Sequence, residues 1–506
     1  MVKNYPRPEE FRTFAEQYNV VPVVTEISAD TETPISVFMK ICGERKNSIL
    51  LESYVGGENF GRFSFICFNP IATFHVKGKK VFLTKKGIVS EVSVENPLDF
   101  LKQYMAQFKQ AKIEGLPDFT GGLVGYVGHE MVRFCDDVKI TTKGKSGYPD
   151  AILMLAGTVI AFDNQKNKIQ IINNVLVENG TDPKLAYEKG MQENEKIIRR
   201  LQNARVDHHF LSLEKSANFK MPGSNFTKEE FMAAVEKGKK YIAAGDAIQI
   251  VLSQKFTTKI KGDAFNLYRT LRNVNPSRYM FYVNFGQVKL VGASPEILVR
   301  LKGEQVTLRP IAGTIKRTHD VEKDCLLAEQ LTNDPKERAE HIMLLDLGRN
   351  DVSRVTEAGT VQVTECMQIE KFSHVMHLIS NVVGQVRKGL DAFDVFKACF
   401  PQGTTTGAPK IRAIEIVNEL EPSDRGPYGG AVGYIGFNGD MDTCIAIRTI
   451  FISGLDATIQ VGAGIVADSI AEKEYEETLM KAGASFVSIN IFQNGGGKDE
   501  KKDTDH

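Results

Sequence analysis

The chain has 506 residues, of which 42% are hydrophobic and 25% charged, a composition typical of a folded globular protein with a substantial core. Lys plus Arg and Asp plus Glu both number 63, so no net positive field attracts nucleic acid or an anionic membrane, and a small-molecule ligand is the default expectation. The seven cysteines form no metal-ligand spacing, and neither an export signal nor a run of about 18 apolar residues is present. We therefore expect a cytoplasmic protein with reduced thiols and no nucleic-acid or membrane partner.

The chain is expected to divide into two folded regions joined by a short connection. Residues 1–205 alternate strand-like runs with turns and helical stretches, which indicates an α+β lobe. Residues 206–226 lose this periodicity and include proline and glycine, as is typical of a connection. A second folded region follows at 227–493. Residues 494–506 are rich in glycine and then almost wholly charged, so we expect a disordered tail.

The second region is expected to begin with a helix followed by a strand. Thr227 and Glu230 have the spacing of a capping box, in which each side chain accepts a hydrogen bond from the other residue's backbone N–H. Residues 247–256 then alternate as a strand does, which places Ile248, Ile250 and Leu252 on one face and Gln249, Val251 and Ser253 on the other. The second face can line a polar site.

A carboxylate lies on the apolar stripe of a later helix. Asp334 and Pro335 mark the start of this helix, and Glu340 then shares a face with Leu344 and Leu347. A charge on a buried face needs a partner. The pattern leaves two interpretations open, a structural ion pair with Arg or Lys and a metal ligand.

Two more carboxylates share a face of the helix expected near residues 471–482. Glu474, Glu477 and Lys481 stand at i, i+3 and i+7. Together with Glu340, these glutamates suit Mg²⁺, which keeps several waters and usually accepts one or two protein carboxylates plus ligand oxygens. The same Glu and Lys spacing is also typical of a solvated helix face, so this alternative stays open.

His374 and His377 have a spacing that would suit a zinc pair on a helix. No cysteine or third histidine is nearby, however, and the β-branched residues around them favour a strand. On a strand the two side chains face opposite sides. We therefore expect at most one of these histidines to enter a site.

Two glycine-containing segments offer backbone N–H groups to an anion. Residues 403–410 lack the GxxxxGK[ST] spacing of a nucleotide-binding loop. They do provide hydroxyls and N–H groups for a carboxylate, as does Gly462-Ala463-Gly464, where missing side chains allow a close approach. Ordinary glycine-rich turns are the alternative interpretation.

A series of ordered motifs carries a family resemblance over most of the chain. The motifs are Leu50-Leu51-Glu52-Ser53, Gly61-Arg62-Phe63-Ser64-Phe65, Gly292-Ala293-Ser294-Pro295-Glu296, Arg309-Pro310-Ile311-Ala312-Gly313-Thr314, Ala339-Glu340-His341, Asp346-Leu347-Gly348-Arg349-Asn350-Asp351 and Arg425-Gly426-Pro427-Tyr428-Gly429-Gly430-Ala431. With them the chain resembles the chorismate-utilising enzymes, and specifically the anthranilate synthase component I family. The resemblance implies an α+β fold, a chorismate-binding α/β sandwich in which large antiparallel sheets enclose a central cleft.

The resemblance also implies which residues bind the ligands in that cleft. Glu340 and Glu477 match the carboxylates that hold Mg²⁺ in similar enzymes, with Glu474 as a nearby contributor, and this ion holds the ring carboxylate of chorismate. The groups expected around the substrate are Gly313, Thr314, Thr404, Tyr428, Arg448, Gly462, Ala463, Gly464 and Lys481.

Glu296 matches the general acid of the family, and His377 matches the histidine that orients the substrate or assists the final elimination. Ammonia is expected to add at ring C2 while the C4 hydroxyl leaves, and hydroxide is a poor leaving group unless it is protonated. Glu296 must therefore stay protonated near neutral pH, which requires a raised pKa. Loss of pyruvate from the aminated intermediate would then give anthranilate.

Two positions separate this activity from that of related enzymes. Isochorismate- and salicylate-forming relatives use a lysine to activate water where this chain has Gln249, and an amide cannot act as a base. Aminodeoxychorismate synthases carry a nucleophilic lysine where this chain has Ala312, which has nothing with which to attack. The pattern therefore favours direct attack of ammonia at C2.

The resemblance further implies a protein partner and an inhibitor. No cysteine lies in the glycine-rich turn of a glutaminase, so ammonia is expected from a separate glutamine amidotransferase subunit. Ser53, Arg278, Tyr279 and Met280 belong to segments that match the tryptophan-binding elements of the family, which predicts feedback inhibition by tryptophan. Many relatives have proline where Arg278 stands, and a long cation there is expected to alter the effector pocket.

Two rival functions stay open. One is aminodeoxychorismate synthase component I of the folate pathway, which would make a 4-amino product without releasing pyruvate. The other is a non-catalytic partner that senses tryptophan and turns over no substrate. The presence of Glu296, Glu340, His377, Arg448 and Glu477 argues against the second, because binding an effector does not require them.

Overall fold

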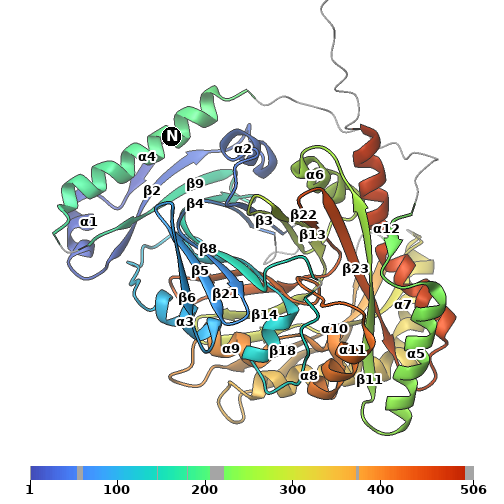
Figure 1. Cartoon of the computed structure of the whole chain (residues 1–506). Helices are drawn as coiled ribbons and strands as arrows, with labels where there is room; N and C mark the ends of the chain where they lie inside the picture. Colours follow the sequence, from blue (N-terminus) through green and yellow to red (C-terminus); the bar gives the residue numbers. More distant parts are fainter. Residues whose placement is uncertain are drawn as a thin grey trace, which may run out of the picture.

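A long antiparallel ribbon organises the fold (Figure 1). The computed structural model describes residues 2–53, 61–144, 146–178, 180–205, 221–318, 320–371 and 375–495. In it, β4 (Phe63–Lys77) pairs with β8 (Ala151–Asp163) from one end to the other, with a bulge between Pro70 and Ala72. Different strands pair with the two halves of this ribbon, so it belongs to two half-sheets at once.

The first half-sheet joins segments from both sides of residues 206–226. Its strands, in spatial order, are β10 (Gly223–Ser224), β11 (Gln249–Lys259), β23 (Asp456–Ile465), β22 (Thr449–Ser453), β13 (Val288–Ser294), β12 (Tyr279–Asn284), β3 (Ser48–Glu52), β4, β8, β9 (Lys168–Leu176), β2 (Val20–Ser28) and β1 (Lys3–Tyr5), and β19 (Gly407–Ala408) also pairs with β11. All of these pairs are antiparallel. Because β3 and β12 are neighbours, the two expected regions share one sheet, and the position of the domain boundary stays a prediction.

The second half-sheet carries most of the remaining strands. In spatial order these are β6 (Ile88–Ser93), β5 (Lys80–Lys85), β4, β8, β7 (Gly122–Val127), β20 (Ala431–Gly436), β21 (Met441–Ile445), β14 (Ile297–Lys302), β15 (Gln305–Leu308) and β18 (Val375–Gln385), which also pairs with β16 (Ile311–Lys316) and β17 (Gln362–Lys371). The chain crosses between the half-sheets from β13 to β14 and again from β21 to β22. Glu296 lies in the first crossing and Arg448 in the second.

Helices lie against the outer faces of the half-sheets (Figure 1). The first half-sheet is covered by α1 (Pro8–Ala15), α2 (Pro34–Ile41), α4 (Pro183–Asn203), α5 (Lys228–Ala243), α6 (Ala264–Val274), α11 (Lys410–Leu420) and α12 (Ala471–Gly495). The second is covered by α3 (Pro97–Met105), the 3₁₀ helix η1 (His129–Phe134), α7 (Val321–Asn333), α8 (Pro335–Ser353) and α9 (Ala392–Cys399), while α10 (Gly403–Thr406) bridges α8 and β11. Among the described residues, no helix combines the length and apolar character needed to cross a membrane.

The inner faces of the two half-sheets pack on each other. One apolar cluster combines Ile49, Phe281 and Phe451 from the first half-sheet with Tyr126 and Val432 from the second. Phe281 and Tyr126 are almost fully buried, and burying an aromatic side chain of this size contributes about 2–3 kcal/mol. The predicted α/β sandwich with large antiparallel sheets is confirmed.

Most local predictions agree with the structure, with one error in β11. Thr227 and Glu230 cap α5 reciprocally, with hydrogen bonds of 3.1 and 2.8 Å. The following strand was expected to begin at Ala247, and this was wrong: β11 begins at Gln249, so Ile248 lies before the strand and is 64% exposed. Finally, α12 continues through Gly495, two residues into the expected tail.

Candidate functional site

Glu296 is a buried carboxyl at the crossing from β13 to β14. Glu296 is only 4% exposed, and burial raises the pKa of the carboxyl to about 8. The Thr404 hydroxyl donates a hydrogen bond to Glu296 Oε1 at 3.0 Å, and the Ile311 backbone N–H also donates to the carboxyl. Both bonds favour the charged form and lower the pKa, so the loss of water dominates. Glu296 is therefore largely protonated at pH 7, as a general acid must be.

His377 is held as a neutral imidazole on β18. Its Nδ1 lies 3.0 Å from the Gly313 carbonyl oxygen and 2.9 Å from Thr314 Oγ1. A carbonyl can only accept a hydrogen bond, so Nδ1 carries the ring proton and Nε2 is the unprotonated nitrogen. Burial lowers the pKa of the ring. The predicted strand is confirmed for His377, whereas His374 lies outside the described residues.

A bulge in β16 shapes the strand opposite His377. The register shifts between Ala312 and Thr314, and Gly313 takes a φ of +68°, a conformation that favours glycine. A Cβ at Gly313 would lie 2.9 Å from Glu337 Oε2. Ala312 is 8% exposed, so a larger side chain there must displace its neighbours.

The groups expected to bind substrate carboxylates converge from four segments. Arg448, in the crossing from β21 to β22, donates from Nη1 to the Lys481 carbonyl on α12 at 2.6 Å. Lys481 Nζ in turn donates to the Gly462 carbonyl on β23 at 3.0 Å. The Tyr428 hydroxyl lies 2.8 Å from the position that a Cβ would take at Gly462. Tyr428 and Arg448 also interact electrostatically, so these groups form one cluster.

The Gly462-Ala463-Gly464 segment presents its two glycines to this cluster and its alanine to the core. A Cβ at Gly464 would lie 2.4 Å from the Gln249 amide nitrogen, so a side chain there would force the Gln249 amide to shift. Ala463 faces the opposite side of β23, where it packs with Ile250 in an apolar cluster. Ala463 therefore contributes only its backbone to the candidate site.

Carboxylates from α8 and α12 lie near one another, and one of them contacts Gln249. The Gln249 amide nitrogen donates to Glu340 Oε1 at 3.4 Å, and Lys481 pairs with Glu477 at 2.6 Å. Burial and then the charge of Glu477 raise the pKa of Glu474. The glutamates thus share one locality, as their helix spacing predicts. The sequence left open an ion pair between Glu340 and an Arg or Lys. Within the described residues Glu340 has no such ion pair, and its partner is the Gln249 amide.

The donor chemistry of this cluster suits a hard cation. Burial, followed by the charge of Glu340, raises the pKa of Glu337, and the charge of Glu477 adds to this effect. Such mutual repulsion is relieved by a cation. Among the described residues, no three His, Cys, Asp or Glu side chains are grouped closely enough to hold a metal ion. Mg²⁺ often needs only one or two protein carboxylates, however, because water and substrate oxygens complete its shell.

The expected effector segments meet where β3 pairs with β12. Glu52 stands opposite Met280 in the register, and Ser53 follows directly, with a buried hydroxyl that has no partner in the described protein. The Tyr279 hydroxyl donates to Asp442 at 2.9 Å. Arg278 is 5% exposed and forms an ion pair with Glu370. The structure thus brings the predicted effector residues to one junction, and their role stays a prediction.

Sequence reasoning missed a buried arginine that ties three parts of the site together. Arg425 donates to the carbonyls of Thr405 and Val251, both at 2.6 Å, and to the carboxylate of Glu421 at 2.7 and 2.9 Å. Its guanidinium also lies 5.5 Å from the ring centre of Tyr428. The Arg-Gly-Pro-Tyr motif was the sequence signal for Arg425, but the motif does not indicate which groups the guanidinium binds.

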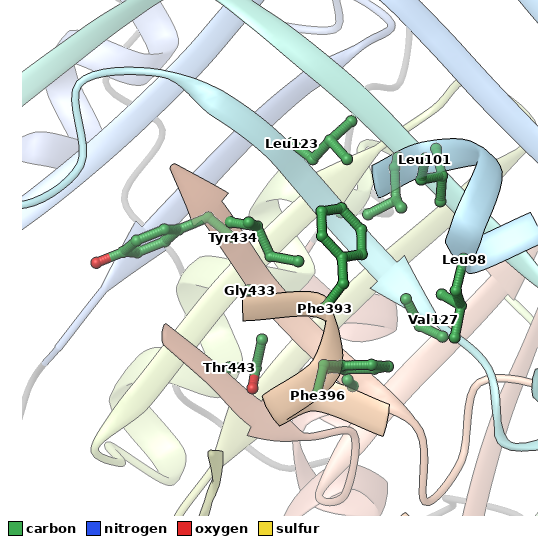
Figure 2. A pocket seen from close by; sticks show the side chains of 13 residues that line it. Leu98, Leu101, Leu123, Val127, Phe393, Phe396, Gly433, Tyr434 and Thr443 are labelled. Carbon is green, nitrogen blue, oxygen red and sulfur yellow. The ribbon is translucent and has the colours of Figure 1, made fainter. Parts of the chain in front are cut away.

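A separate cavity between α3, α9 and the second half-sheet does not serve this chemistry. It measures about 30 Å³ and is lined mainly by apolar side chains, including Leu98, Phe393 and Phe396 (Figure 2). No charged side chain lines it. A cavity of this size holds about two waters at most, so it cannot hold a dianion such as chorismate.

Comparison with known proteins identifies the family. The family model described as chorismate binding enzyme matches residues 46–486. The chain is 46% identical over 488 residues to anthranilate synthase component 1 of Aquifex aeolicus, covering 96% of this chain and 98% of that protein. It is 44% identical over 492 residues to the protein of the same name from Pseudomonas aeruginosa, covering 96% and 99%.

Solved structures agree with this match. Anthranilate synthase component I from Streptococcus pneumoniae superposes with a TM-score of 0.75 at 36% identity, over 91% of this chain and 99% of that one. The menaquinone-specific isochorismate synthase of Escherichia coli has a TM-score of 0.69 at 18% identity, over 95% and 98%, which shows the shared fold alone. The chain therefore belongs to the chorismate binding enzyme family, and within it to the anthranilate synthase component I proteins.

Proposed function

We propose that this chain converts chorismate and ammonia into anthranilate and pyruvate. The observation that carries the proposal is Glu296, a carboxyl whose burial raises its pKa to about 8. Amination at ring C2 requires the C4 hydroxyl to leave, and a protonated carboxyl can supply the proton that makes it leave as water. The neutral His377, with Nδ1 bound to the Gly313 carbonyl, is the base we assign to the following loss of pyruvate.

The substrate's two carboxylates are assigned to opposite sides of the site. The Arg448 guanidinium and the Tyr428 hydroxyl bind one of them, because both belong to the cluster around Gly462. Backbone N–H groups of the glycine segment would add to this binding. Arg448 keeps its charge even though burial lowers its pKa, since an arginine starts from a very high value. The Thr404 hydroxyl, bound to Glu296, positions the acid.

The ring carboxylate is assigned to a Mg²⁺ ion at the carboxylate cluster. Glu340 and Glu477 would hold it, with Glu474 close by, and their mutual repulsion with Glu337 supports a cation there. Bound Mg²⁺ would neutralise negative charge and orient the substrate carboxylate. The lyase assignment follows from the loss of pyruvate.

Two positions support amination at C2 over related reactions. The Gln249 amide faces Glu340 and cannot deprotonate water as a lysine does. Ala312 is buried beside the bulge of β16 and supplies no amine for a covalent intermediate. These two side chains argue against isochorismate formation and aminodeoxychorismate formation respectively.

We further propose a glutamine amidotransferase partner and inhibition by tryptophan in the cytoplasm, as a step of tryptophan biosynthesis. The relatives are named component 1, which supports a second component that supplies ammonia. For tryptophan, support comes from the buried, unpartnered hydroxyl of Ser53 next to the paired Glu52 and Met280.

One incubation tests the proposed reaction. Purified protein is mixed with chorismate, Mg²⁺ and ammonium, and anthranilate is followed by its fluorescence while pyruvate is measured enzymatically. We expect equal amounts of both products, and activity that EDTA abolishes and Mg²⁺ restores. A 4-amino product without pyruvate would show aminodeoxychorismate synthesis instead, and chorismate binding without any product would show a non-catalytic sensor.

A further inference from the structure

A carboxylate on β17 connects the effector segment with the catalytic histidine. Arg278, which directly precedes β12 and is 5% exposed, donates from Nη2 to Glu370 Oε1. Arg309 donates from Nη2 to the other oxygen of Glu370 at 3.2 Å. Glu370 is thus held by two cations, one from the effector segment and one from the connection between β15 and β16, which leads into the bulge at Gly313.

Glu370 stands directly opposite His377 in the pairing of β17 with β18. Side chains at opposite positions of an antiparallel pair lie on the same face of the sheet and within reach of each other. Consistent with this, the negative charge of Glu370 acts on His377 to raise its pKa, against the larger lowering caused by burial. A displacement of Glu370 therefore reaches His377 without an intervening residue.

The strand that carries Glu370 pairs with a single neighbour through an interrupted ladder. Among the described strands, β17 pairs only with β18, and that ladder is interrupted between Val363 and Glu365 and again before Gln368. Met367, inside the interruption, has a φ of +50°, a conformation that a residue with a side chain rarely adopts. An edge strand with an interrupted ladder is held by fewer backbone hydrogen bonds, so it belongs to the less stable elements of the fold.

We propose that Glu370 is a positioning residue that transmits occupancy of the effector segment to His377. A ligand seated against Ser53 and Met280 displaces Arg278, Glu370 follows its ion-pair partner, and His377 loses its productive position. This relay deepens the proposed function, because it rests on tryptophan inhibition of anthranilate synthesis.

The substitution Glu370→Gln, with Glu365→Gln as its matched control, tests the relay. Glu365 also lies on β17 and pairs with Arg309 at 3.1 Å, but it does not face His377. We expect Glu370→Gln to lower kcat about fivefold with KM for chorismate within about twofold, as expected for a lost positioning contact. Saturating tryptophan should inhibit the parent and Glu365→Gln about tenfold or more, and Glu370→Gln less than about twofold.

Two further measurements separate the relay from overall damage and from the proposed function. Calorimetry should show that Glu370→Gln still binds tryptophan, so that only the coupling is lost. In protein labelled with ¹³C-histidine, tryptophan should move the imidazole signal of His377 in the parent but not in Glu370→Gln, with His377→Asn used to assign that signal among the nine histidines. This readout needs no turnover, so it tests the relay even where no anthranilate forms.

Three results would overturn the relay. They are full tryptophan inhibition of Glu370→Gln, equal movement of the His377 signal in parent and variant, and absence of tryptophan binding to the parent protein. A parent that binds tryptophan and shifts His377 but makes no anthranilate would refute the proposed reaction and leave the relay supported.

Discussion

Replacing Glu296 with glutamine removes the proton that the proposed reaction needs while preserving the shape of the side chain. Glutamine can still accept the hydrogen bond that Thr404 donates at 3.0 Å, so the pocket should keep its geometry. We expect kcat to fall by about 10²-fold or more, the usual contribution of a general acid, while chorismate still binds. The parent should lose activity above about pH 8, because its buried acid ionises there.

The same substitution has a signature in stability. Folding raises the pKa of Glu296 from 4.5 to about 8, so the folded protein holds this proton more tightly than the unfolded chain does. The contribution of this tight binding is fully present below pH 4.5 and is lost as the pH rises through about 8. At about 1.4 kcal/mol for each tenfold change in proton affinity, the total is at most about 5 kcal/mol.

Two assays measure these effects. Steady-state anthranilate fluorescence between pH 6 and 9 gives the activity profile, and urea unfolding at the two ends of this range gives the stability. Between these pH values the parent should lose about 2–3 kcal/mol more than Glu296→Gln does. Near-parental turnover by Glu296→Gln would remove this residue from the mechanism, and equal pH dependence of unfolding would show that its carboxyl is not titrating as a buried acid.

Three other substitutions probe the rest of the site. Gly464→Ala would place a Cβ 2.4 Å from the Gln249 amide, so KM for chorismate should rise at least about tenfold. The control Gly483→Ala has open space around the new Cβ and should change KM and kcat little. Glu340→Gln should weaken Mg²⁺ binding about tenfold or more by calorimetry, and unchanged affinity would place the ion elsewhere. Ala312→Lys should lose much of its anthranilate synthesis, since overpacking costs about 1–3 kcal/mol. It should not make the 4-amino product efficiently, because a working amine also needs a lowered pKa. Product chromatography measures both compounds, and anthranilate formation at the parental rate would show that Ala312 does not lie beside the substrate.

Local elements could be predicted because their signals are local. The reciprocal cap between Thr227 and Glu230 and the strand around His377 each depend on residues close in sequence, and each agrees with the structure. The one error at Ile248 arose because alternation alone does not show where a sheet edge begins. The start of the strand depends on the neighbouring strand that pairs with it and on the helix that packs against it, and both come from distant segments.

The arrangement of the site could not be predicted from local pattern, because it depends on crossings between the half-sheets. Nothing around Arg425 indicates that its guanidinium reaches Glu421 and the Val251 carbonyl. The positive φ of Gly313 likewise follows from a bulge that only the partner strand defines. Family resemblance supplied the residue identities, whereas the structure supplied their contacts and burial.

One physical condition at the crossings serves two opposite chemical needs. Glu296 must be uncharged and Arg448 must be charged, yet both are buried, and burial raises the pKa of the first and lowers the pKa of the second. The two requirements are compatible because an arginine starts far above neutral pH and a carboxyl starts below it. Exclusion of water therefore keeps the Glu296 carboxyl protonated without removing the charge of Arg448. It follows that a cavity-forming substitution that admits water beside Glu296 should shift the alkaline limit of activity to lower pH while leaving carboxylate binding by Arg448 nearly unchanged.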